Sequence, residues 1–196
     1  MDWTGLYKKI RKQFVGDGYK KLVERSLIAY GDKELTHYKE ALDVYNEVFK
    51  DCCLYKVQAY EGIPELLDFL KEHKILATVL SNKPHQRTLD NVSYDFLEII
   101  RLIRYTEKEK RRASKKKPAP DGVVALIKEL GLKKEECLYL GDTNTDMKTG
   151  QAAQVDTVGV TWGFRPREEL EAFTPKLVAD SPFQVIDYIK AVNHIE

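Results

Sequence analysis

The fold is decided by residues 137–146, which read Cys-Leu-Tyr-Leu-Gly-Asp-Thr-Asn-Thr-Asp. The first four residues predict a short buried strand that ends at Gly141, and a helix is predicted at about 146–153. Asp142 and Asp146 stand four residues apart where strand meets helix, so both carboxylates can face one point. Carboxylate oxygens suit Mg2+, which keeps several waters and takes few protein ligands. The pair therefore predicts a magnesium site; the alternative is that Asp142 caps the helix and Asp146 is a surface residue.

Further short apolar runs predict strands at 75–80, 157–160 and 177–179, with helices between them. Such runs, separated by helices, are typical of a parallel sheet that is covered on both faces. The predicted fold class is therefore α/β, with a Rossmann-like three-layer arrangement. In such sheets ligands bind beyond the carboxyl ends of the strands. At those ends this sequence places Ser81, Asp142 and Thr161.

The amino-terminal part of the chain predicts helices only. Leu6, Ile10 and Phe14 form one short apolar face, and helices are predicted at 19–29 and 35–50. From about residue 60 the pattern changes to alternating helices and strands. We therefore predict a helical subdomain at 1–55, an α/β core at 56–196, and no strand within residues 5–50.

Composition narrows the possible partners. Lys and Arg number 32 against 31 Asp and Glu, which gives no electrostatic argument for nucleic acid or a membrane surface. The basic run at 108–117 is typical of a solvated loop, and a nucleic-acid patch there is the minor alternative. Three cysteines, an odd count, and no charged-then-apolar leader predict a reduced, cytoplasmic protein. The oligomeric state is left open.

Two further segments carry groups suited to phosphate. Lys117 precedes Pro118-Ala119-Pro120, and such a rigid start can aim a fixed positive charge at a phosphoryl group. Ser81 and Asn82 follow a predicted strand and offer a hydroxyl group and donors that can hold phosphate. Simpler alternatives are that Lys117 only belongs to the basic run and that Ser81 is an ordinary helix N-cap.

These segments, taken together and in this order, resemble a known family. Residues 80–84, 117–120 and 141–146 look like the second, third and fourth motifs of haloacid dehalogenase phosphatases. Residues 159–165, Gly-Val-Thr-Trp-Gly-Phe-Arg, resemble the phosphoglycolate phosphatase branch of that family. Residues 14–23 resemble the helical cap that this branch inserts after its first strand and closes over substrate.

The resemblance implies a magnesium-dependent phosphomonoester hydrolase that acts on a small phosphorylated metabolite through an aspartyl-phosphate. It implies that Lys117 and Ser81 are catalytic, and that Ser81, Asn82 and Lys117 bind substrate. Asp142 and Asp146 would then bind Mg2+. The resemblance does not choose a substrate, and a sugar-phosphate mutase or a pyrophosphatase of the same fold stays possible.

One segment of the family pattern is missing. The first motif, Asp-x-Asp-Gly-Thr, ends an opening strand in the middle of the sheet, and its first Asp attacks phosphorus. This sequence contains no such motif. Asp2 lies too close to Gly16 to leave room for the start of a cap, so no nucleophile is assigned.

We therefore expect a chain that lacks its beginning, is inactive as it stands, and leaves two neighbouring strands without a partner. The main alternative is a catalytically inactive relative that binds a phosphorylated ligand or a protein partner. A nucleic-acid-binding module that uses residues 108–117 is a third hypothesis.

Overall fold

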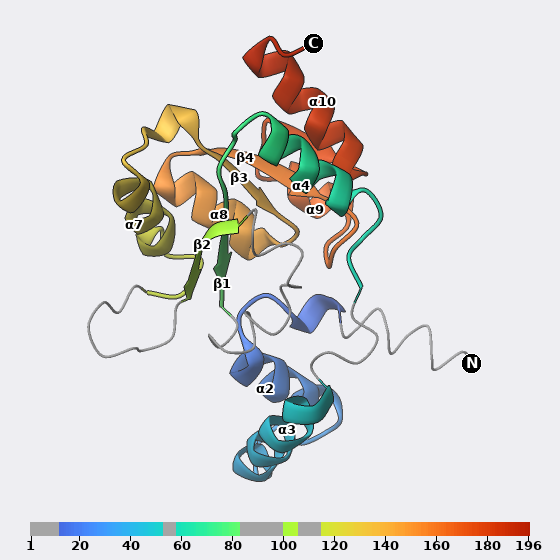
Figure 1. Ribbon diagram of the computed structural model, residues 1–196. Helices are drawn as coiled ribbons and strands as arrows, with labels where there is room; N and C mark the ends of the chain where they lie inside the picture. Colours follow the sequence, from blue (N-terminus) through green and yellow to red (C-terminus); the bar gives the residue numbers. More distant parts are fainter. Residues whose placement is uncertain (1–11, 53–57, 83–99, 106–114) are drawn as a thin grey trace. The chain divides into compact units, whose positions relative to one another are not determined.

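The computed structural model describes residues 12–52, 58–82, 100–105 and 115–196. The chain divides into two compact units, Met1–Val57 and Gln58–Glu196, which are described separately (Figure 1). As predicted, no strand occurs between residues 12 and 50, the part of the 5–50 range that the structure describes. The role of the first unit as a cap stays a prediction.

The long helices that the structure describes in the first unit are α2 (Tyr19–Ala29) and α3 (Tyr38–Cys52). Aromatic packing joins them, because the ring of Tyr45 on α3 stacks on Tyr19 of α2 at 5.6 Å between centroids. Within α3, Tyr45 also stacks on Phe49 at 5.2 Å. Burial raises the pKa of Tyr45 above its usual value. The predicted helix at 19–29 is confirmed with the same bounds.

The second unit alternates helices and strands, as predicted. Its elements are α4 (Ile63–Glu72), β1 (Ala77–Ser81), β2 (Ile100–Tyr105), α7 (Asp121–Leu130), η1 (Lys134–Glu136), β3 (Leu138–Gly141), α8 (Asn144–Ala153), β4 (Asp156–Val160), α9 (Arg167–Glu171), β5 (Leu177–Ala179) and α10 (Pro182–Asn193). The sequence had not predicted β2 or α9. All pairings between these strands are parallel, which confirms the α/β class.

The described strands form two sheets. One has the order β1-β2 and the other has the order β3-β4-β5. In the larger sheet, β4 lies between β3 and β5, with Leu140 opposite Val158 and Val160 opposite Ala179. Among the described residues, no strand joins β1 to β3.

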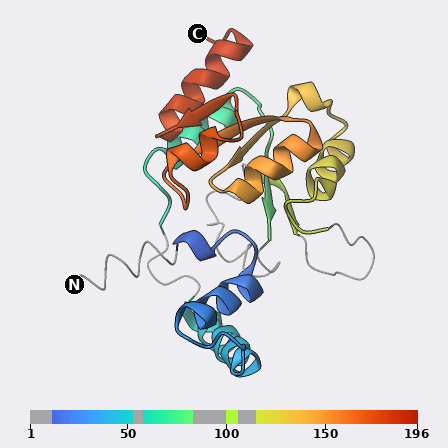
Figure 2. The same cartoon turned by 180° about the vertical axis from the view of Figure 1, so that it is seen from behind.

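Helices cover both faces of the larger sheet (Figures 1 and 2). On one face, Leu66 of α4 and Val185 of α10 pack in one cluster with Val158 of β4. On the other face, α8 lies directly on β4, because a Cβ at Gly150 would lie 2.1 Å from Cγ2 of Thr157. Alternate residues of β4 therefore serve opposite layers.

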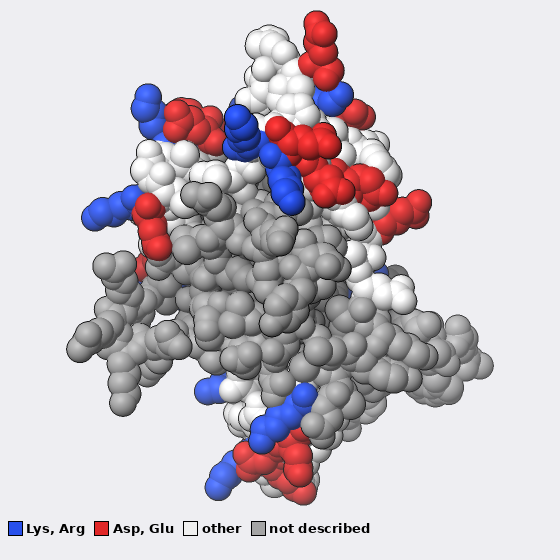
Figure 3. All heavy atoms as spheres, in the orientation of Figure 1, with Lys and Arg blue, Asp and Glu red and all other residues white. Residues whose placement is uncertain are grey.

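The described surface carries charges of both signs. On the face in Figure 3, Lys and Arg side chains lie among Asp and Glu side chains. Residues 106–114, most of the basic run, lie outside the described residues, so the nucleic-acid hypothesis stays untested. Among the described residues, no helix combines the length and apolar character needed to cross a membrane.

The burial of side chains predicts how much their truncation destabilises the protein. Leu170 of α9 is fully buried, with 0% exposed, whereas Val192 of α10 is 54% exposed. Leu170→Ala should lower the free energy of unfolding by about 2–5 kcal/mol, because it removes buried methyl groups and leaves a cavity. The matched control Val192→Ala should stay within about 0.5 kcal/mol of the parent chain. Urea unfolding followed by circular dichroism measures both; equal effects would contradict this packing.

Candidate active site

The site is built around the amino-terminal end of α8. Thr143 is the N-cap of this helix, and its hydroxyl accepts a hydrogen bond from the main-chain N–H of Asp146 at 3.2 Å. The same hydroxyl donates to Oδ2 of Asp146 at 2.6 Å. Gly141 makes this approach possible, because a Cβ there would lie 2.1 Å from Cβ of Asp146. The local sequence thus turns the Asp146 carboxylate back over the end of β3.

A buried ion pair joins this helix to the segment before α7. Lys117 donates from Nζ to Oδ1 of Asp146 at 2.6 Å, and the side chains of Lys117 and Asp146 are 13% and 7% exposed. The hydroxyl of Tyr139, from β3, donates to the same oxygen at 3.3 Å. Asp146 therefore receives hydrogen bonds from an ammonium group and two hydroxyl groups, which offset the cost of burying its charge.

Tyr139 is fixed in its neutral, donating form. Burial, the charge of Asp146, their hydrogen bond and the charge of Asp142 all raise the pKa of Tyr139 far above its usual value. The phenol therefore keeps its proton at any physiological pH, and it acts as a donor to Asp146.

Asp142 lies in a different environment from Asp146. Its Oδ2 accepts a hydrogen bond from the main-chain N–H of Phe164 at 3.1 Å, and its carbonyl oxygen accepts one from Arg165 N–H at 3.2 Å. Gly163 lets this loop approach, because a Cβ there would lie 2.0 Å from the same Oδ2. Burial and the negative charge of Asp146 raise the pKa of Asp142, although the Phe164 N–H opposes this. A bound cation would stabilise the ionised form of Asp142 and would therefore lower its pKa.

Ser81 and Asn82 stand at the carboxyl end of β1. The Asn82 side chain is buried and holds both main-chain groups of Lys117: Oδ1 accepts from its N–H at 3.0 Å, and Nδ2 donates to its carbonyl at 3.3 Å. Asn82 therefore fixes the backbone from which Lys117 reaches Asp146. The expected contacts of Ser81 and Asn82 with substrate stay predictions.

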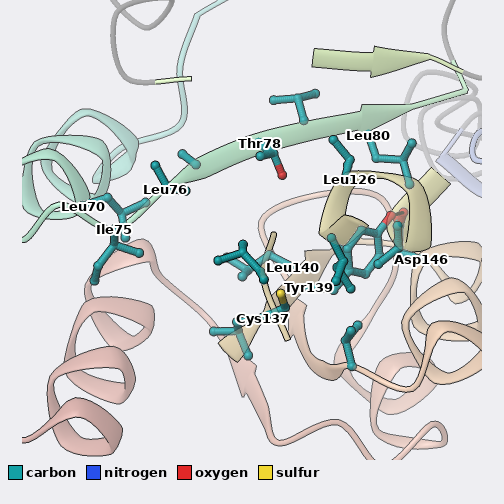
Figure 4. A pocket seen from close by; sticks show the side chains of 18 of the residues that line it. Leu70, Ile75, Leu76, Thr78, Leu80, Leu126, Cys137, Tyr139, Leu140 and Asp146 are labelled. Atoms are coloured by element: carbon teal, nitrogen blue, oxygen red, sulfur yellow. Dashed lines mark hydrogen bonds between the residues drawn. The ribbon is translucent and has the colours of Figure 1, made fainter. Parts of the chain in front are cut away.

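The structure gathers most of the predicted residues at one place. Lys117, Asp142 and Asp146 all line a cavity of about 490 Å³ in the second unit, and Figure 4 shows Asp146 and Tyr139 at one end of it. Asn82 joins them through Lys117. Within the described ranges, no group of three or more His, Cys, Asp or Glu side chains could hold a metal ion. Asp142 and Asp146 fit Mg2+ as a partial set, since this ion commonly takes one or two carboxylates and completes its shell with water and substrate.

Sequence reasoning missed four contributors to this geometry. Thr143 had a signal, because a Thr three residues before an acidic residue at a helix start is a common N-cap pattern. Tyr139 also had one, because it lies two residues before Gly141 and therefore on the same side of the strand. Gly163 and Phe164 lie in the family-like segment 159–165, but the resemblance did not predict their contact with Asp142, which forms only when the end of β4 is placed beside that of β3.

Comparison with known proteins gives the same assignment as the motifs. The family of haloacid dehalogenase-like hydrolases matches residues 6–160. A phosphoglycolate phosphatase from Colwellia psychrerythraea is 30% identical over 175 residues, which cover 86% of this chain and 75% of that protein. An N-acetylmuramic acid 6-phosphate phosphatase from Pseudomonas aeruginosa is 26% identical, over 77% of this chain and 64% of its own length.

The fold has a close counterpart in a solved structure. A protein from Lactobacillus delbrueckii subsp. bulgaricus, provisionally assigned as a phosphoglycolate phosphatase, superposes with a TM-score of 0.82 and 26% identity. The match covers 96% of this chain and 84% of that one. This chain therefore belongs to the haloacid dehalogenase-like hydrolase family and is similar to its phosphoglycolate phosphatases.

Proposed function

We propose that this chain carries the phosphate-binding and cation-binding part of a magnesium-dependent phosphomonoester hydrolase. The observation that supports this most is that Lys117, Asp142 and Asp146 line one cavity, with Nζ of Lys117 2.6 Å from Oδ1 of Asp146. A buried ammonium group beside paired carboxylates suits a phosphoryl group that is held together with a cation. The substrate class is a small phosphorylated metabolite, with phosphoglycolate as the first candidate from the relatives.

The proposed roles follow from the contacts. Lys117 stabilises negative charge on the phosphoryl oxygens, Asn82 positions Lys117, and Ser81 offers a hydroxyl group at the same strand end. When bound, Mg2+ would neutralise phosphoryl charge during transfer. Asp142 is the better placed ligand for it, because Asp146 already receives hydrogen bonds from Lys117 and two hydroxyl groups.

The route through an aspartyl-phosphate needs an attacking carboxylate that this sequence does not contain in the family's motif. We therefore propose that the chain has no hydrolase activity by itself. The second candidate is an inactive relative that binds a phosphorylated ligand. The lack of the attacking carboxylate in this sequence favours it. A cytoplasmic location is likewise a proposal, drawn from the cysteine count.

The environment of Asp142 predicts a pH dependence of stability. Its pKa is raised on folding, mainly by burial, so the folded state binds more protons than the unfolded state between the two pKa values. The ionised carboxylate therefore lowers the free energy of unfolding at neutral pH. Asp142→Asn should raise the melting temperature at pH 7 in buffer with a metal chelator. This gain should shrink as the pH falls towards about 3.9, the ordinary pKa of aspartate.

Calorimetry from pH 3 to pH 7 measures this dependence. The matched control is Asp68→Asn on the exposed side of α4, where the same removal of a carboxylate should give no gain of this shape. A stability gain for Asp142→Asn that is constant across the pH range, or absent, would contradict this prediction. It would show that the ionised carboxylate of Asp142 does not destabilise the folded state.

The chain as it stands and the same chain extended by the family's first motif should differ in hydrolase activity. The purified chain should release phosphate from phosphoglycolate or an aryl phosphate only at the background rate, with or without Mg2+. The chain extended at its amino end by an apolar strand that ends in Asp-x-Asp-Gly-Thr should show magnesium-dependent release. In that extended chain Lys117→Met should lower kcat by about 10²–10³-fold, the usual effect of losing one charge-stabilising donor.

The control is the extended chain with Asn in place of the first Asp of the added motif, which should be inactive. Magnesium-dependent turnover by the unextended chain would contradict the proposal. It would direct the search for the nucleophile to Asp2 and Asp17.

A further inference from the structure

The loop between β4 and α9 reaches back to the first residue after β3. Within it, the N–H of Phe164 donates to Oδ2 of Asp142 at 3.1 Å, and the N–H of Arg165 donates to the carbonyl oxygen of Asp142 at 3.2 Å. Gly163 allows this contact, because a Cβ there would lie 2.0 Å from the same Oδ2. Two consecutive N–H groups therefore hold both the side chain and the backbone of Asp142.

The side chain of Arg165 is buried although it carries a charge. It is 6% exposed, and its Nε lies 3.2 Å from Oε1 of Glu169, whose side chain is 37% exposed. Burying a guanidinium group costs free energy unless acceptors compensate it. Because Glu169 belongs to α9, this ion pair ties the part of the loop that contacts Asp142 to the helix that follows it.

Other contacts fix the two ends of the loop. At its start, the hydroxyl group of Thr161 donates to Oδ1 of Asp180 at 2.8 Å. At its end, Arg167 donates to Oδ2 of Asp180 at 2.7 Å and to the carbonyl oxygen of Val178 at 3.0 Å. These contacts anchor both ends to the end of β5. The ion pair of Arg165 therefore acts on the middle of the loop, where the N–H groups meet Asp142.

The orientation of Asp142 decides how well it can bind a cation. Mg2+ demands a nearly ideal octahedral shell with short distances, so a ligand oxygen that points wrongly binds poorly. Groups that hold a metal-binding carboxylate by hydrogen bonds therefore tune the affinity for the metal without touching it. Phe164 supplies such a hydrogen bond to Asp142, and Arg165 anchors the next residue of the loop.

We propose that Arg165 is a positioning residue for the cation site: its ion pair with Glu169 holds the N–H groups that orient Asp142. Arg165 thereby acts on a bound cation through the carboxylate of Asp142. The part of this proposal that concerns the cation rests on the proposed function. The part that concerns the orientation of Asp142 does not.

The first measurement is amide hydrogen exchange of the full chain, resolved by residue with NMR. Glu169→Gln keeps the shape of the side chain but removes its charge, and the variant should fold because this side chain is 37% exposed. Exchange of the amide protons of Phe164 and Arg165 should quicken by about fivefold, the effect expected when one main-chain hydrogen bond is weakened.

The second measurement is the affinity of the same samples for Mn2+, followed by the electron paramagnetic resonance signal of the free ion. Mn2+ takes the same oxygen ligands as Mg2+. Glu169→Gln should raise the Kd for Mn2+ by about 10–100-fold, the usual effect of losing a group that holds a metal ligand. Gly163→Ala should raise it too, because the added Cβ displaces Oδ2 of Asp142. Asp142→Asn should abolish the binding.

The matched control is Glu171→Gln. Glu171 lies on the same helix and pairs with Arg167, also four residues away, at 2.9 Å. This change removes the same charge from α9 but leaves the ion pair of Arg165 in place. The two exchange rates and the Kd for Mn2+ should stay within about twofold of the parent values, as is usual for an exposed position.

Unchanged exchange of the Phe164 and Arg165 amides in Glu169→Gln would overturn the proposal, and so would equal effects of Glu169→Gln and Glu171→Gln. Faster exchange with an unchanged Kd for Mn2+ would also overturn it, because the ion pair would then hold the loop without serving the cation. No Mn2+ binding by the parent chain, or binding that survives Asp142→Asn, would overturn the cation site of the proposed function instead. The exchange rates would still decide whether Arg165 orients Asp142.

Discussion

The ion pair between Lys117 and Asp146 is the interaction on which the site depends. Both side chains are almost fully buried and lie 2.6 Å apart, so each charge is stable only while the other is present. Thr143 and Tyr139 complete the hydrogen bonding of the carboxylate, and Gly141 lets it lie against β3. The pair therefore fixes the segment before α7, the end of β3 and the start of α8 at a single point.

The same contacts join the two sheets at their carboxyl ends. Asn82 at the end of β1 holds the backbone of Lys117, and Lys117 holds Asp146 beside β3. Farther from these ends, residues of β1 and β3 line the same cavity, together with residues of α4, α7 and α10.

Much of the fold could be predicted from periodicity, because α2 and β5 are continuous patterns with clear ends. β2 could not, because arginines at positions 101 and 104 interrupt its apolar run. The motifs predicted that Lys117, Asp142 and Asp146 converge, but they did not predict how Asp146 is used. Lys117 lies 29 residues before Asp146, and no local spacing predicts that its ammonium group meets the Asp146 carboxylate.

The most direct measurement is a double-mutant cycle of unfolding free energies with Lys117→Met and Asp146→Asn. If the pair organises the site, Lys117→Met alone should cost about 3–5 kcal/mol, because it leaves the Asp146 charge buried without its cation. The double variant should then cost less than the sum of the single changes, with a coupling free energy above about 0.5 kcal/mol. Additive single effects would contradict the account, since Lys117 and Asp146 would then stabilise the protein independently.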